Sequence, residues 1–224
     1  MNDQPDTSAL NPTKSFYDRI SSVYDLIADA NEHMARDRGL ERLAIAPGEN
    51  VLVVGFGTGH SVVALARGVG RTGKVMGIDI SDGMLSVARK RIADEGVADH
   101  VDISLGDARH LECSDNQFDA VFMAFTLELF DDNDIPRVLN EIRRVLRPGG
   151  RFGVVAMSQE PHATLMTDIY VWMHRHFPHW VDCRPISVAP RLQQAGFAVE
   201  HTETLSLWGL PVAVVVASKS TLTR

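Results

Sequence analysis

The chain has 224 residues, of which 45% are hydrophobic and 23% charged, a composition typical of one globular domain. Its net charge of −7 and its lack of a basic run argue against nucleic acid as a partner. Two cysteines, Cys113 and Cys183, are too few for a disulfide framework and favour a reducing compartment. Because neither a signal peptide nor a membrane-spanning apolar run is visible, we expect a cytoplasmic protein with at most peripheral membrane contact.

The first 46 residues precede any predicted strand. Residues 1–13 are polar and contain two prolines. A helical pattern of apolar residues begins at Ser15, and Pro47-Gly48 ends it. We therefore predict an N-terminal tail with lid helices at 1–46 and the main domain at 47–224.

Short apolar runs alternate with helical patterns after Pro47. Buried strands are predicted at 51–54, 74–78, 101–105, 118–125 and 151–157, with helical patterns between them that include a clear one at 134–146. This alternation indicates an α/β fold, a parallel sheet with helices on both faces. The last two strands, 197–205 and 212–218, are joined by so short a turn that they must be antiparallel.

A glycine-rich segment, Gly55-Phe56-Gly57-Thr58-Gly59, joins the first strand to a helix. Glycine lets a ligand approach the backbone, and a helix N-terminus attracts an anionic group. Asp79 ends the next strand, 20 residues after Gly59, where a carboxylate can accept both hydroxyls of a ribose. Together these features predict a nucleoside ligand, whereas the alternative is a tight turn without a ligand.

The pattern G-x-G-x-G differs from the dinucleotide fingerprint G-x-G-x-x-G, because His60 follows a third glycine that comes one residue early. It resembles instead the class I S-adenosylmethionine (SAM) methyltransferases. Gly106-Asp107-Ala108 after the third strand and Val145-Leu146-Arg147-Pro148-Gly149-Gly150 before the fifth are also typical of that class. The resemblance covers residues from about 14 to 218.

Two N-terminal runs, Phe16-Tyr17-Asp18-Arg19-Ile20 and Val23-Tyr24-Asp25, are similar to the signature of the ubiquinone/menaquinone-biosynthesis methyltransferase group. Two positions depart from the family pattern. Val53 stands where the family usually carries an acid that helps hold the SAM amino group, and Ala124 to Phe130 lack the Gly-Leu-Arg-Asn run of the quinone enzymes.

The resemblance implies a three-layer Rossmann-like fold with a seven-stranded, mostly parallel sheet and an antiparallel last strand. It also implies S-adenosyl-L-methionine as the cofactor, with the glycine-rich loop at the methionine end, Asp79 at the ribose and Asp107 at the adenine edge. The implied cofactor-binding residues are Tyr24, Gly55, Phe56, Gly57, Thr58, Gly59, Asp79, Ile80, Met84, Asp107, Ala108 and Ala124.

Aromatic and histidine residues gather after the fifth strand, where the family inserts a substrate cap, which we place at about 158–190. The run from Trp172 to Trp180 fits a packed surface, a substrate pocket or a metal site made by His174, His176 and His179. These histidines lack the HExxH spacing, so we predict no metal. The candidate substrate-pocket residues are Tyr17, Phe125, Glu128, His162, Trp172 and His176.

Methyl transfer from a sulfonium is an in-line displacement with a neutral leaving group, so alignment and exclusion of water are the main tasks. We expect no catalytic triad and assign no catalytic residue. The predicted function is methylation of a small, apolar or aromatic molecule. The alternatives are a phospholipid (phosphatidylethanolamine-type) N-methyltransferase, an NAD(P)-dependent oxidoreductase and a non-catalytic nucleoside binder. The oligomeric state, including a homodimer, is left open.

Overall fold

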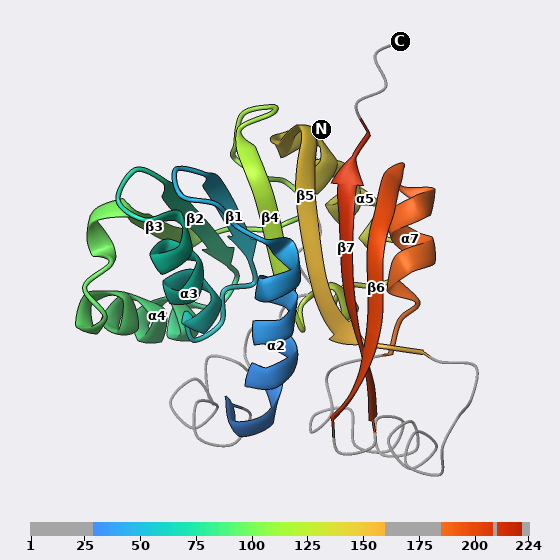
Figure 1. The fold of residues 1–224 in the computed structure, drawn as a ribbon, viewed down its shortest axis with the longest axis horizontal. Coiled ribbons are helices and arrows are strands. Elements are labelled where there is room, and N and C mark those ends of the chain that lie inside the picture. Colours follow the sequence, from blue (N-terminus) through green and yellow to red (C-terminus); the bar gives the residue numbers. More distant parts are fainter. Residues whose placement is uncertain (1–28, 160–184, 208–209, 221–224) are drawn as a thin grey trace, which may run out of the picture.

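The computed structural model describes residues 29–159, 185–207 and 210–220, and the structural statements below concern these residues. Seven strands form one sheet in the order β3-β2-β1-β4-β5-β7-β6 (Figure 1). The first five strands are parallel, and β7 runs antiparallel to both of its neighbours. This arrangement confirms the predicted sheet. The strands are β1 (Asn50–Val54), β2 (Lys74–Asp79), β3 (Val101–Leu105), β4 (Phe118–Ala124), β5 (Leu146–Met157), β6 (Phe197–Leu207) and β7 (Leu210–Lys219).

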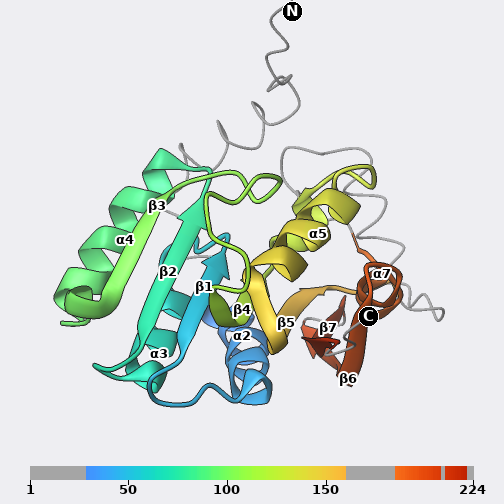
Figure 2. The ribbon, with the colours of Figure 1, turned by 90° about the horizontal axis from the view of Figure 1, so that it is seen from above.

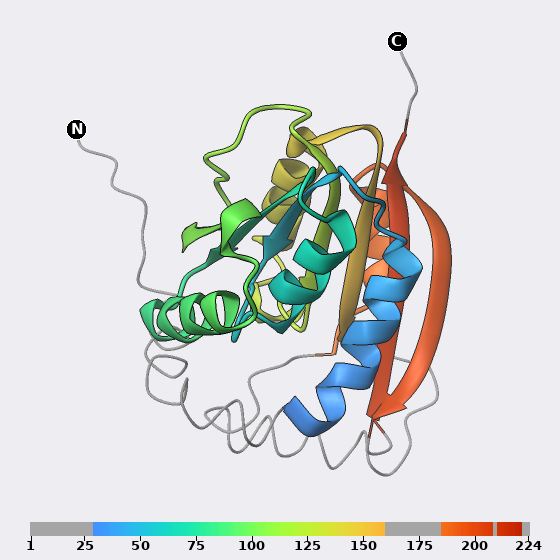
Figure 3. The same cartoon turned by 60° about the vertical axis from the view of Figure 1, so that its left-hand side comes forward.

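Helices cover both faces of the sheet and complete the three predicted layers (Figures 2 and 3). One face carries α2 (Asp29–Leu43), α3 (His60–Val69) and α4 (Asp82–Asp94), and the other carries α5 (Ile135–Val145) and α7 (Val188–Gln194). Two single 3₁₀ turns, η2 (Ala98–His100) and η3 (Leu127–Leu129), lie in connections. In the described part of the chain, no helix is both long and apolar enough to cross a membrane.

The central strands are apolar at every position because helices bury both of their sides. In β1, Leu52 and Val54 belong to the core under α5 and α7, whereas Val51 and Val53 belong to the core under α2, α3 and α4. Neighbouring side chains of a strand point to opposite faces, so a strand buried on both sides needs an unbroken apolar run. The run at 51–54 is therefore a direct consequence of the layered fold.

Helix α2 lies unusually close to the sheet, and a glycine makes this possible. A Cβ atom built on Gly39 would overlap Val155 Cγ2 and lie 3.1 Å from Phe122 Cε2. On the same helix, Ala35 and Leu43 are fully buried. The backbone of α2 thus packs directly on β4 and β5, as a small residue permits.

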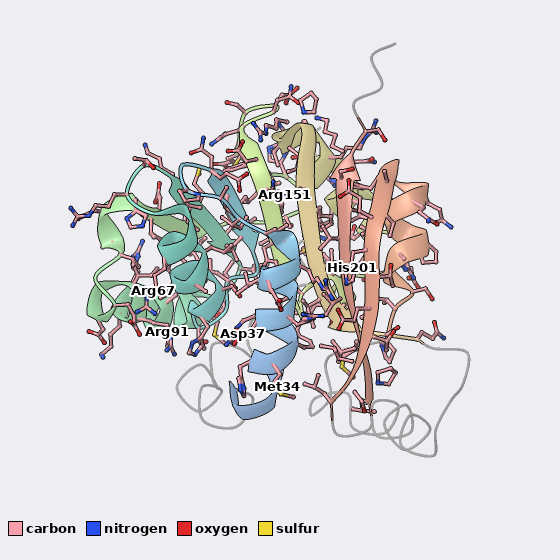
Figure 4. The ribbon with its side chains drawn as sticks, in the orientation of Figure 1. Met34, Asp37, Arg67, Arg91, Arg151 and His201 are labelled. Atoms are coloured by element: carbon pink, nitrogen blue, oxygen red, sulfur yellow. The ribbon has the colours of Figure 1, made fainter. Side chains whose placement is uncertain are left out.

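A cluster of charges holds α2 at the far edge of the sheet. Glu203 on β6 accepts hydrogen bonds from Arg38 Nε at 3.0 and 3.1 Å and from Arg42 Nε at 3.2 Å. His201 Nε2 lies 3.2 Å from the same carboxylate, and Figure 4 labels this histidine on β6. The hydrogen bond from Arg38, with smaller contributions from His201 and Arg42, lowers the pKa of Glu203 to about 2.

Strand β5 begins earlier than the predicted start at residue 151. Leu146 already pairs with Phe118, and Arg151 pairs with Ala120, so five steps on β5 face two steps on β4. Gly149, with a φ of +72°, lies in the extra residues of this bulge. Helix α5 therefore passes directly into β5, and the Arg-Pro-Gly-Gly run is an irregular part of the strand.

The connection from β3 to β4, residues 106–117, contains no helix. The Arg144 side chain on α5 holds this connection by donating to the carbonyl oxygens of Cys113 at 2.7 Å and Leu111 at 2.9 Å. Glu141 orients the guanidinium through two hydrogen bonds of 2.8 Å and also accepts the Leu111 N–H. The planar guanidinium of Arg144 thus holds the connection 106–117 against α5.

We expect Arg144→Ala to lower the free energy of unfolding by about 1–2 kcal/mol, because two loop carbonyls lose charged donors. Arg144→Lys should restore little of this loss, since an ammonium cannot reproduce the planar fork. Urea unfolding of both variants measures the effect. Arg89→Ala, at an exposed position of α4, is the control. An Arg144→Ala transition that coincides with that of Arg89→Ala would contradict the prediction.

Candidate functional site

The carboxyl ends of β1 and β2 are joined by one carboxylate. Asp79, the last residue of β2, accepts the backbone N–H of Gly57 through Oδ2 at 2.8 Å and that of Ser81 through Oδ1 at 3.0 Å. Gly57 lies in the turn that follows β1. The sequence predictions for the glycine-rich turn and for Asp79 thus meet at one place, at the edge of the sheet where ligands bind in open α/β folds.

The three glycines of this turn have different surroundings. A Cβ atom on Gly55 would overlap the side chain of Thr126, and one on Gly59 would lie 3.0 Å from Ala88 Cβ. Gly57 combines a φ of +52° with no neighbouring atom within 4 Å of a Cβ. Gly55 and Gly59 therefore allow close internal packing, whereas Gly57 borders open space that a ligand can enter.

The start of α3 lies directly behind the turn. Its N-cap residue, Gly59, has no side chain that could cap the helix, so the helix end can face an anionic group. Arg91 of α4 donates from Nε to the Thr58 carbonyl at 2.8 Å and holds the turn from outside. Figure 4 places Arg91 near the lower end of the view, where the parallel strands end. Phe56 is buried, so its side chain belongs to the core.

The segment after Asp79 leads into α4. Ser81 accepts the backbone N–H of Met84 at 3.2 Å and thereby caps the helix. Ile80 is half-buried, whereas Met84 is only 2% exposed and belongs to the core between α4 and the sheet. Both lie in the segment that borders Asp79.

The end of β3 lies beside the end of β2. The Gly106 N–H donates to the Asp79 carbonyl at 2.9 Å, so Asp107 follows one residue beyond this contact. The Asp107 carboxylate accepts hydrogen bonds from Arg109, and Ala108 is buried. The predicted ribose and adenine residues are therefore on adjacent strand ends.

The end of β4 carries a strained residue. Phe125 has a φ of +50°, a left-handed conformation that bulky residues rarely adopt, and its N–H donates to Val155 O at 2.7 Å. Thr126 Oγ1 donates to the Ala124 carbonyl at 2.9 Å, and its side chain packs against Gly55. Such strain is common at binding sites, where the surrounding fold enforces it. The turns after β1 and β4 are thus in direct contact.

A buried carboxylate lies on the 3₁₀ turn η3 beyond this strained residue. Glu128 is 2% exposed, and its Oε1 accepts the Met157 N–H at 3.0 Å. Since Met157 is the last residue of β5, this hydrogen bond joins the ends of β4 and β5. Of the predicted substrate-pocket residues, Phe125 and Glu128 therefore lie at the same edge of the sheet as the glycine-rich turn.

The remaining predicted residues lie outside the described part of the chain. They are Tyr17, Tyr24, His162, Trp172 and His176, together with most of the predicted cap at 158–190. The histidines His174 and His179 of the alternative metal site also lie there. In the described residues, no group of three potential metal ligands comes together.

Sequence reasoning missed three residues that shape this site. Ser81 carries a local signal, because a serine directly before a helical pattern is a typical N-cap. Arg91 and Thr126 contact the glycine-rich turn from 33 residues away and from a different strand end, respectively. Their roles depend on strand order, which no local pattern encodes.

Several known proteins are similar to this chain in sequence. A family model described as a methyltransferase domain matches residues 51–150. Demethylmenaquinone methyltransferase of Symbiobacterium thermophilum is 37% identical over 172 residues, which are 74% of this chain and 66% of that protein. The ubiquinone/menaquinone biosynthesis C-methyltransferase UbiE of Hahella chejuensis is 33% identical over 172 residues, which are 74% of this chain and 68% of that protein.

The fold also matches a solved structure. The crystal structure of the [4+2]-cyclase SpnF aligns with a TM-score of 0.74 and covers 94% of this chain and 96% of that one, at 20% sequence identity. At this identity the likeness concerns the fold alone. The chain spans just under two thirds of the length of the Symbiobacterium relative.

Proposed function

Because this chain belongs to the class I S-adenosylmethionine-dependent methyltransferases, we propose that it transfers a methyl group from SAM to a small aromatic or apolar acceptor. The observation that carries the proposal is the hydrogen bond from Gly57 N to Asp79 Oδ2, which holds a turn that borders open space beside the carboxylate at the end of β2. A quinol-type acceptor is favoured by what the names of the relatives say of those proteins.

The residues present fit SAM. The open side of Gly57 and the uncapped N-terminus of α3 suit the amino acid end of the ligand, whose carboxylate a helix N-terminus attracts. The Asp79 carboxylate lies directly beside this open turn, because its Oδ2 accepts the Gly57 N–H at 2.8 Å. We assign the ribose hydroxyls to this carboxylate.

When bound, SAM supplies an activated methyl group on a positively charged sulfur. The protein then has to hold the acceptor in line with that methyl and keep water out. We assign this task to the end of β4, where strained Phe125 and buried Glu128 border the turn that packs on Gly55. No general base is assigned, since one is needed only if the acceptor arrives protonated.

Calorimetric titration with S-adenosylhomocysteine tests the cofactor, with NADH as the control. Micromolar binding of the first ligand alone is expected. Transfer of labelled methyl from SAM is then measured with quinols, phenols and phosphatidylethanolamine vesicles as acceptors. Methylation of the vesicles alone would favour the phospholipid alternative, and tight binding of NADH alone would overturn the methyltransferase proposal.

We expect Asp79→Asn to weaken S-adenosylhomocysteine binding about 10- to 100-fold, because charged acceptors of the ribose hydroxyls and of the Gly57 N–H are lost. Calorimetry measures the change. Asp102→Asn is the matched control, since Asp102 is an exposed carboxylate in the middle of the adjacent strand β3. Equal affinity of the two variants would speak against Asp79 as the ribose residue.

A second candidate is a non-catalytic binder that has the fold but has lost affinity for the cofactor. Val53 favours it, because this buried, apolar side chain leaves no carboxylate at the position where the family usually carries an acid. Calorimetric titration and the methyl-transfer assay together distinguish the methyltransferase from the binder. Absence of S-adenosylhomocysteine binding, together with absence of transfer to any acceptor, supports the binder, whereas transfer to one acceptor excludes it.

A further inference from the structure

Arg109 is a largely buried arginine at the end of β3 whose side chain folds back on its own turn. The Arg109 side chain is 14% exposed. Its Nε lies 3.1 and 3.0 Å from the two oxygens of Asp107, and Nη2 lies 2.8 Å from Oδ2. The Arg109 backbone N–H donates to Oδ1 of the same carboxylate at 2.9 Å. Three N–H groups of one residue thus hold one carboxylate.

The far side of Arg109 is fixed as well. Nη1 donates to Asp134 Oδ2 at 2.9 Å, and the Arg109 carbonyl accepts Arg137 Nε at 3.0 Å. Asp134 is the N-cap of α5, yet its side chain makes no capping bond within its own helix. The start of α5 therefore holds the arginine in place, and the arginine holds Asp107.

The hydrogen bonds from Arg109 affect both the charge of Asp107 and the number of further hydrogen bonds that its carboxylate can accept. Burial by itself raises the pKa of this carboxyl, but the hydrogen bonds from Arg109 outweigh burial and leave the pKa below its usual value. An ionised carboxylate can accept about four hydrogen bonds, and Arg109 supplies three. Asp107 is left as a fixed, charged acceptor with room for about one more donor.

The position of Asp107 indicates which ligand group would donate the remaining hydrogen bond to its carboxylate. The ends of β1, β2 and β3 are neighbours along one edge, and Gly106 is hydrogen-bonded to the Asp79 carbonyl. A nucleoside with its ribose at Asp79 and its other end at the glycine-rich turn must direct its base toward the end of β3. A base with an exocyclic amine offers a donor there, whereas a carbonyl at the same position would face a negative charge.

We propose that Arg109 is a positioning residue that holds Asp107 as the acceptor for the base and so makes the site select a 6-amino over a 6-oxo purine. The proposal rests on the proposed function, because it takes the bound nucleoside to be that of SAM. Arg109 acts through Asp107 and contacts neither the base nor the methyl group.

The test is calorimetry with two ligands, S-adenosylhomocysteine and S-inosylhomocysteine, on the full chain. The wild-type protein should prefer the adenosyl ligand at least about tenfold, as expected for a site that is built around one donor. Arg109→Met retains an apolar stem but not the fork, so it should weaken adenosyl binding about tenfold and reduce the preference to below about threefold. The ratio of the two affinities is the readout, because a merely structural role would weaken both ligands equally.

Two further variants complete the design. Asp134→Ala removes the outer partner of Arg109 but leaves the Asp107 contacts, so the preference should persist. Arg109→Lys keeps the charge but not the planar fork, so its preference for the adenosyl ligand should be intermediate. If the methionine variant does not fold, the affinity ratio of the lysine variant tests the inference.

Two results would overturn the inference: no preference in the wild-type protein, or an unchanged ratio of the two affinities in the Arg109 variants. Failure of the wild-type protein to bind S-adenosylhomocysteine would instead defeat the proposed function. The two failures are therefore distinguishable in one set of titrations.

Discussion

Gly57→Ala is expected to weaken the binding of S-adenosylhomocysteine about 10- to 100-fold, the equivalent of forcing one extra methyl group into a filled site. The site tolerates the methyl group as long as no ligand is bound, because nothing lies within 4 Å of a Cβ at this position. The left-handed φ of +52° should cost only about 1–2 kcal/mol of stability. Calorimetric titration and urea unfolding measure the two effects separately.

Gly96→Ala is the matched control for this variant. Gly96 also has a positive φ, +68°, and no atom within 4 Å of a Cβ, but it follows the C-terminal end of α4 and lies outside the glycine-rich turn. The two variants should lose similar stability, and only Gly57→Ala should lose affinity. Equal affinities would mean that the ligand does not pass over Gly57.

Gly39→Ala is expected to lower the free energy of unfolding by about 1–3 kcal/mol through overpacking between α2 and the sheet. Helix propensity alone predicts the opposite sign, since alanine in a helix interior is better than glycine by about 0.5–1 kcal/mol. The steric term prevails because the new Cβ would overlap Val155 Cγ2, a stiff β-branched side chain. Urea unfolding measures the change.

Val155→Ala provides the control, because it removes the methyl group that the new Cβ would overlap. Adding Gly39→Ala to this background should be neutral or stabilising, and the difference between the two backgrounds measures the steric coupling. Destabilisation of equal size in both backgrounds would show that the clash with Val155 is not its cause. Binding of S-adenosylhomocysteine should be unchanged in the folded variants.

Much of the fold could be predicted from local patterns. The strand at 101–105 and the helix at 135–145 agree closely with their predicted ranges, because burial on one or both faces imposes a periodicity that a short window reveals. The glycine-rich turn and Asp79 were also predicted from local patterns, because a turn that needs glycine and an acid at a strand end are recognisable from residues about 20 positions apart. The predicted antiparallel last strand is confirmed because a short turn permits no other pairing.

Contacts between distant segments could not be predicted in this way. The contact that fixes Arg109 from its far side was invisible, because Asp134 lies 25 residues from Arg109 and reaches it only through the packing of α5. Arg147 to Gly150 were predicted to precede the fifth strand, and their place in a bulge between the pairs Leu146–Phe118 and Arg151–Ala120 emerges only when β4 and β5 are adjacent. Glu128 was predicted as one of several substrate-pocket residues, and its burial against the end of β5 is a property of the assembled sheet.

The sequence by itself determined the α/β layers, the glycine-rich turn and the acid at the end of β2, because each of these depends on residues that are close along the chain. Only the tertiary structure decided which side chains meet at the edge of the sheet: Thr126 on Gly55, Arg91 on Thr58 and Gly106 on Asp79. The physical reason is that strand order brings together segments 27 to 71 residues apart, and this order depends on the packing of both faces at once, which no local window contains.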